Sequence, residues 1–85
     1  MKVKQLDWLE IPESNEKRHE RGERYSAYVP RIGEYVIMQD GDLYVRHYHG
    51  NLRICSFPDT LLYLNSFKQI AQQHYEQLIL ENIDG

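Results

Sequence analysis

Residues 34–57 read EYVIMQDGDLYVRHYHGNLRICSF, and this stretch decides the fold. Apolar and polar side chains alternate through it, with interruptions at Asp40-Gly41 and Gly50-Asn51. Asp-Gly between alternating runs is a strong hairpin signal, because both central residues of a type I′ turn need positive φ angles. Gly-Asn is a weaker form of the same signal. The stretch therefore predicts a three-stranded antiparallel meander over residues 33–57.

Two-residue turns at both positions would fix the register of the strands and the face of each side chain. Met38 would then lie opposite Leu43, and Glu34 opposite His47. The predicted core face carries Val36, Met38, Leu43, Val45, Leu52 and Ile54. The opposite face gathers aromatic residues and arginines, namely Tyr35, Ile37, Tyr44, Arg46, Tyr48, Arg53, Cys55 and Phe57.

Weaker strand signals precede the meander. Residues 3–11 and 24–29 alternate loosely, and each run closes at a proline, Pro12 or Pro30. Residues 12–24 hold charges of both signs and no large apolar side chain. Such a stretch adds nothing to a core, so we expect an exposed, mobile charged loop there, with a short solvated helix as the alternative.

The last part of the chain predicts a helix. Ser66 and Gln69 match a capping box, and apolar residues follow them at helical spacing, so we expect a helix over residues 66–82. For residues 58–65 the sequence leaves two alternatives, a link without regular structure or an additional helical turn. The predicted fold class is α+β, and residues 1–85 form a single domain. An antiparallel meander of about four or five strands packs one face against one C-terminal helix.

The composition narrows the class of protein. The chain carries a formal net charge of -3 and a single cysteine, Cys55, which cannot form an internal disulfide. No apolar run is long enough to span a membrane, and the first residues lack the apolar region of a secretion signal. We therefore expect a cytoplasmic protein without membrane contact.

Two histidines offer the only hint of a metal site. His47 and His49 lie two apart on one predicted strand, but the register brings only Glu34 close to them, and zinc needs three or four ligands. A cross-strand pair of Glu34 with His47 is the favoured interpretation. Cys55 is expected on the opposite face, where neither histidine can act as its base. We expect no catalytic residue, no metal and no cofactor, and we expect that the chain is not an enzyme.

A candidate interaction face follows from the register. It consists of Tyr35, Tyr44, Arg46, Tyr48 and Arg53. Exposed aromatic residues and arginines are typical of protein interface hot spots, so the sequence favours a non-enzymatic protein-interaction module. The alternative is a small nucleic-acid-binding accessory protein that stacks bases on the same face, although the net negative charge argues against it. A solvated face, or one covered by the N-terminal strand or by residues 58–64, also stays open.

The predicted helix is apolar on more than one side. Leu78-Ile79-Leu80 is followed one turn later by Ile83, and one sheet face cannot bury all of these side chains. A homodimer through Leu80 and Ile83 would cover them. Folding of the helix end onto the body of the domain is the alternative.

Five residues of the predicted helix, Lys68, Ala71, Gln72, Tyr75 and Glu76, follow the pattern Lys-x-x-Ala-Gln-x-x-Tyr-Glu. With the preceding meander, this pattern resembles small uncharacterised phage and prophage proteins, in which a few strands precede such a helix. The resemblance implies a protein of the bacterial cytoplasm, encoded by a phage or a bacterium, and it carries no established activity or site residues. The interaction partner would then be a host or phage protein, and the chain a phage-encoded modulator or inhibitor of it.

Overall fold

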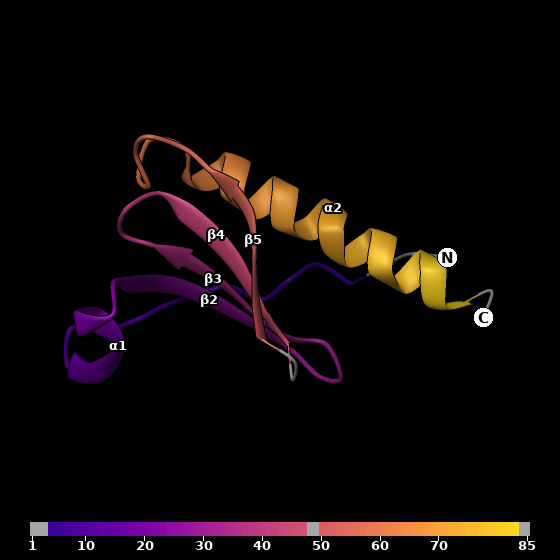
Figure 1. Ribbon diagram of the computed structural model, residues 1–85, viewed down its shortest axis with the longest axis horizontal. Helices are drawn as coiled ribbons and strands as arrows, with labels where there is room; N and C mark the ends of the chain where they lie inside the picture. The colour runs from indigo at the N-terminus through magenta and orange to yellow at the C-terminus, as the bar shows by residue number, and fades with distance from the viewer. Residues whose placement is uncertain (1–3, 48–49, 84–85) are drawn as a thin grey trace.

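The computed structural model describes residues 4–47 and 50–83 (Figure 1). One antiparallel sheet has the strand order β1-β2-β3-β4-β5, so strands that are neighbours in the sequence are also neighbours in the sheet. The α+β class with a C-terminal helix is confirmed. The elements are β1 (Leu9–Glu10), α1 (Glu16–Glu20), β2 (Glu23–Val29), β3 (Gly33–Met38), β4 (Asp42–His47), β5 (Gly50–Ser56) and α2 (Leu64–Ile83).

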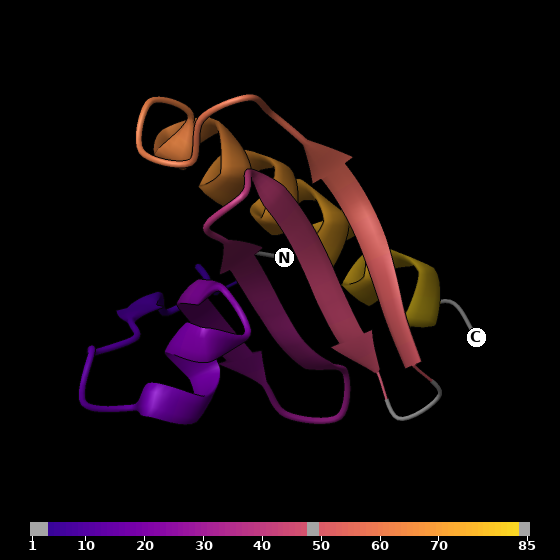
Figure 2. The same ribbon diagram turned by 60° about the vertical axis from the view of Figure 1, so that its left-hand side comes forward.

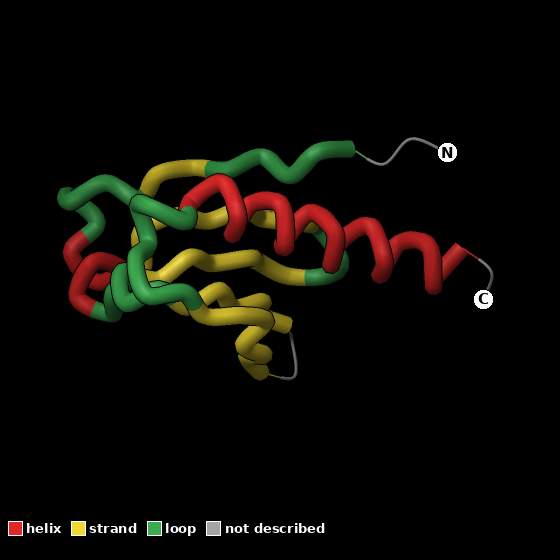
Figure 3. The backbone as a smooth tube through the Cα atoms, turned by 90° about the horizontal axis from the view of Figure 1, so that it is seen from above, coloured by secondary structure: helices red, strands yellow, loops and turns green. Residues whose placement is uncertain are grey.

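The two helices lie on opposite sides of the sheet. Figure 2 shows α1 in front of β2 while α2 crosses behind the sheet, and we call the two sides the α1 face and the α2 face. The N-terminal segment runs beside α2 (Figure 3), because Gln72 accepts a hydrogen bond from the amide of Leu6 at 2.8 Å and donates one to the carbonyl of Lys4 at 3.2 Å.

The core lies between the sheet and α2. Phe67 and Ala71 are one helical turn apart and fully buried, which places both on the stripe of α2 that faces the strands. Alanine at the second position lets the helix approach the sheet closely. The sheet contributes Ala27, Val29, Tyr35, Ile37, Leu43 and Val45 to the same buried cluster.

The β3–β4 turn corrects the predicted register. Its loop has three residues, since Ile37 pairs with Leu43 and the amide of Gly41 donates to the carbonyl of Met38 at 3.2 Å. Gly41 has φ 93, the left-handed conformation that a three-residue hairpin needs at its last loop position. The extra loop residue shifts β3 by one position, which exchanges its two faces. Tyr35 and Ile37 therefore face α2, while Val36 lies on the α1 face opposite Tyr44.

The second turn signal, Gly50-Asn51, does not form a turn. β4 ends at His47 and β5 begins at Gly50, so Gly50 and Asn51 belong to a strand and not to a turn. Arg53 pairs with Tyr44 and Leu52 with Val45, and the register shifts between Leu43 and Tyr44. At the end of this hairpin, His47 pairs with Gly50.

Residues 12–24 contain α1, the short solvated helix that the sequence offered as the alternative to a loop, and an irregularity follows it at the start of β2. Glu23 pairs with Met38 and Tyr25 with Ile37, so Arg24 is an extra residue in a β-bulge. The bulge turns the side chain of Glu23 to the α1 face, where it is fully buried. The segment therefore contains α1 and the start of β2, and it contributes an internal group to the domain.

Candidate interaction surface

The five residues of the predicted interaction face do not stay together. Tyr44, Arg46 and Arg53 lie on the α1 face as expected, because Tyr44 pairs with both Val36 and Arg53. Tyr35 lies on the other face and is fully buried, so its prediction as a contact residue is wrong. Tyr48 lies outside the described residues.

Tyr35 joins the sheet to the helix. Its hydroxyl lies 2.7 Å from Nδ1 of His74, and the two rings meet edge to face with centroids 5.6 Å apart. Burial, with a smaller effect of Tyr75, raises the pKa of the Tyr35 hydroxyl. Burial and the neighbouring His47 lower the pKa of His74, against the effect of Glu81. Both shifts favour the neutral forms, so the bond joins a neutral hydroxyl to a neutral imidazole.

A cluster of charged side chains covers part of the α1 face. Glu23 is its centre: it accepts a hydrogen bond from Arg18 Nε at 2.7 Å and forms an ion pair with Arg21 Nε at 3.0 Å. Arg46 binds the same carboxylate with both terminal nitrogens, at 3.1 and 2.9 Å. Burial disfavours the charged form of Glu23, but the hydrogen bonds from Arg46 and Arg18 outweigh it and lower the pKa of this carboxyl. We call these residues, together with Glu34, the arginine–glutamate cluster.

Glu34 links the same arginines. It accepts from Arg18 Nη2 at 2.9 Å and lies 3.8 Å from Arg46 Nη1. The predicted pair of Glu34 with His47 is therefore wrong, since the residue across the strand is Arg46. Arg46 is held by two carboxylates, which makes it a structural residue of this face and not a free contact for a partner.

Strand β5 provides the longer exposed edge of the sheet. It is the last strand in the sheet order and pairs only with β4. Its first four residues, Gly50 to Arg53, are all exposed. Leu52 keeps 53% of its surface exposed, although its cross-strand partner Val45 is fully buried. The opposite edge, β1, has only two residues.

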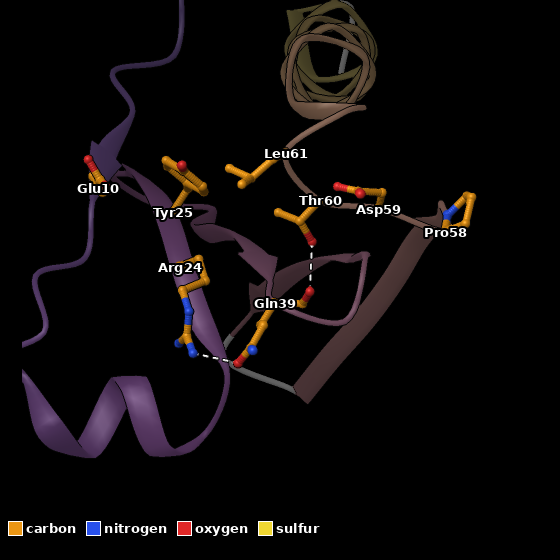
Figure 4. Close-up of a pocket in the computed structure, with 8 residues that line it drawn as sticks. All are labelled: Glu10, Arg24, Tyr25, Gln39, Pro58, Asp59, Thr60 and Leu61. Carbon is orange, nitrogen blue, oxygen red and sulfur yellow. Dashed lines mark hydrogen bonds between the residues drawn. The ribbon is translucent and has the colours of Figure 1, made fainter.

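Two shallow hollows have no residue of β5 in their linings. The first encloses about 420 Å³ between the start of β2 and the link before α2 (Figure 4). Arg24 and Gln39 lie at its base, joined by a hydrogen bond, and Thr60 donates to the carbonyls of Met38 and Gln39. The second hollow encloses about 410 Å³ and is lined by Tyr28, Arg31, Gly33, Glu34, Arg46 and His47.

Neither hollow brings reactive groups together. In residues 4–47 and 50–83, no group of three or more His, Cys, Asp or Glu residues is placed to hold a metal ion. Burial and the nearby Asp42 raise the pKa of the Cys55 thiol, so a smaller fraction of it is in the reactive thiolate form.

The apolar end of α2 is only partly described. Leu80 is 53% exposed, as a dimer contact would be in the free chain. The side chain of Ile83 lies outside the described part of the structure. A homodimer through these two residues stays a prediction.

A comparison of the chain with protein-family models, with curated proteins and with solved structures finds no match. In the described part of the chain, no helix has the length and apolar character that crossing a membrane requires. Fold and surface together define an α+β domain with one long, accessible sheet edge.

Proposed function

We propose that this protein is a non-enzymatic protein-interaction module that binds an extended segment of a partner along β5. The single observation that carries the proposal is the free edge of this seven-residue strand. An edge strand presents a row of backbone N–H and C=O groups that no neighbouring strand satisfies. A partner segment can pair with these groups and extend the sheet.

The structure of the edge favours such pairing. Proteins usually protect an exposed edge with prolines, with several charges, or with a covering loop. β5 contains no proline and only one charged residue, Arg53, and its first four residues are exposed. The two sheet edges also differ, because β1 is too short to pair with more than a few residues of a partner.

The proposal revises which residues contact the partner. Tyr44 and Arg53 remain from the predicted face, while Leu52 joins them from the other side of the strand. The sequence resemblance adds the further proposal that the partner is a host protein that a phage-encoded chain modulates or inhibits.

Site-specific photo-crosslinking tests the proposed edge. A photoreactive benzoylphenylalanine replaces Asn51 on β5 in one variant and Gln69, an exposed residue of α2, in a control variant. We expect a discrete adduct in bacterial lysate from position 51 and none of the same mass from position 69. Adducts that form equally from both positions, or only from position 69, would contradict the proposal.

Binding of single-stranded nucleic acid is the second candidate function. It is supported by Tyr44 beside Arg53 on the α1 face, an aromatic residue next to a cation. The formal net charge of -3 and the neutralisation of Arg46 by two glutamates weigh against it. A salt-dependent shift with an oligonucleotide, lost in Arg53→Glu, would favour this function over the first.

A further inference from the structure

We infer that the partner segment is an extended strand with acidic side chains on one face and apolar side chains on the other. This inference rests on the proposed function and names the chemistry of the partner. It follows from the two faces of β5, which differ in charge and in polarity.

The α1 side of β5 is basic. Arg53 is exposed and forms no ion pair within the described residues. Its neighbour across the strand is the uncharged Tyr44, and Asn51 lies opposite Arg46. A strand added beyond β5 would place one of its side chains close to Arg53. Opposite charges on neighbouring strands attract, so an acidic residue suits this position.

The α2 side of β5 is apolar. Leu52 lies beside Val45 on this side, and about half of its surface is exposed. An added strand would cover the side chain of Leu52 with its own residue on the same face. Removal of apolar surface from water is favourable, so an apolar residue suits this position. Successive residues of a strand point to opposite faces. The two preferences together therefore require a partner segment in which acidic and apolar residues alternate.

A second copy of this chain fits the edge less well. β5 reads GNLRICS and contains no acidic residue. Pairing of β5 with β5 of another copy would therefore leave both Arg53 side chains without a carboxylate from the added strand. The centred antiparallel register would place them directly opposite each other, which is destabilising. A foreign strand with acidic residues avoids this repulsion.

Two synthetic heptapeptides test the inference. One alternates Glu with Val, and the other alternates Lys with Val, so that the apolar face is the same and only the charge differs. Backbone amide shifts of β5 and their titration curves give the position and affinity of binding. We expect the Glu/Val peptide to bind about three- to tenfold more tightly, from one favourable charge pair replacing one unfavourable pair.

Two charge-reversed variants sharpen this test. Arg53→Glu should reverse the preference for the peptides. Lys17→Glu is the matched control, because Lys17 is an exposed residue of α1 and the change in charge is the same. The helix α1 lies at the β2 end of the sheet, and β5 forms the opposite edge (Figure 2). This control variant should leave the preference unchanged. Two further peptides carry N-methyl groups, one on its odd-numbered and the other on its even-numbered residues. Only one of these peptides should lose binding, because only every second N–H group of an added strand points at β5.

Several results would overturn the inference. Equal binding of both peptides, a preference for Lys/Val, or no shift of the β5 amides with either peptide would each do so. Shifts of these amides with protein concentration alone would identify a second copy as the occupant. Displacement of the Glu/Val peptide by an oligothymidine would identify nucleic acid. The crosslinking from position 51 decides separately whether β5 is used at all, so the inference can fail while the proposed function stands.

Discussion

The hydroxyl of Tyr35 on β3 lies 2.7 Å from Nδ1 of His74 on α2, and this bond is a polar link through the interface between sheet and helix. Tyr35 is fully buried, so water cannot replace the imidazole as its partner. The pair occupies the place where the sequence predicted an exposed contact residue. A hydrogen bond is directional, so this bond constrains the orientation of α2 on the sheet. Apolar packing alone does not impose such a constraint.

Tyr35→Phe should lower the free energy of unfolding by about 1 kcal/mol, because the imidazole loses its partner while the ring still fills the core. In a domain of this size, this corresponds to a fall of roughly 4–8 °C in Tm. Thermal and urea unfolding measure it. Tyr28→Phe is the matched control, since Tyr28 is 70% exposed, and it should change little. Equal stability of Tyr35→Phe and the native chain would show that the bond contributes nothing.

Acidification should weaken the fold through His74. Burial lowers the pKa of this imidazole in the folded chain below its ordinary value of 6.5. As the pH falls through the pKa that His74 has in the unfolded chain, the unfolded state takes up the proton first. The contribution of neutral His74 to the free energy of unfolding is therefore complete above about pH 6.5 and is lost below it. Urea unfolding between about pH 7.5 and about pH 5.5 measures this loss. His74→Gln should flatten this part of the profile, and an unchanged profile would exclude His74 as its source.

Glu23→Gln should destabilise the protein by about 2 kcal/mol, because the buried side chain loses its charge-assisted hydrogen bonds to arginines that are themselves partly exposed. Arg18, Arg21 and Arg46 all bind this carboxylate. Glu20→Gln removes the same charge from an exposed position of α1 and serves as the control. Denaturant unfolding compares the two variants. Equal stabilities would mean that the arginine–glutamate cluster is not a structural element.

The β2–β3 turn holds Arg31 in a left-handed conformation, with φ 75. The amide of Ile32 donates to the carbonyl of Val29 at 3.2 Å, and Pro30 lies before Arg31, as in a type II turn that favours glycine at this position. Arg31→Gly should therefore be more stable than Arg31→Ala by about 1 kcal/mol, since alanine keeps the left-handed strain and glycine removes it. Thermal unfolding of both variants measures the difference. A higher Tm for the alanine variant would contradict the turn assignment.

The local signals of the sequence predicted the fold class and the long helix. The helical spacing of apolar residues indicated a helix over residues 66–82, and α2 spans Leu64–Ile83, so Ser66 lies inside the helix and not at its N-cap. The three strands of the meander also form within the predicted range of residues 33–57, although β5 begins at Gly50, where a turn was predicted. These features depend on neighbouring residues, so a single sequence is sufficient to recognise them.

The faces of the strands were not predictable in the same way. Asp40-Gly41 indicates a hairpin, but it does not say whether the loop has two or three residues, and one residue exchanges the faces of Tyr35 and Val36. The bulge at Arg24 has no sequence signature either, and without it the burial of Glu23 cannot be foreseen. The predicted interaction face depends on which side of the sheet each residue occupies, so its prediction was less accurate than that of the fold.

Hydrogen exchange of the β5 amides tests the central claim most directly. The measurement compares residues 50–56 in the free protein and in the complex with the protein captured through position 51. A strand added to this edge should protect alternate amides of β5, because every second N–H points away from β4. Increased protection at alternate residues of β5 is the result that we predict. Unchanged exchange along β5 in a complex that protects amides elsewhere would contradict the account.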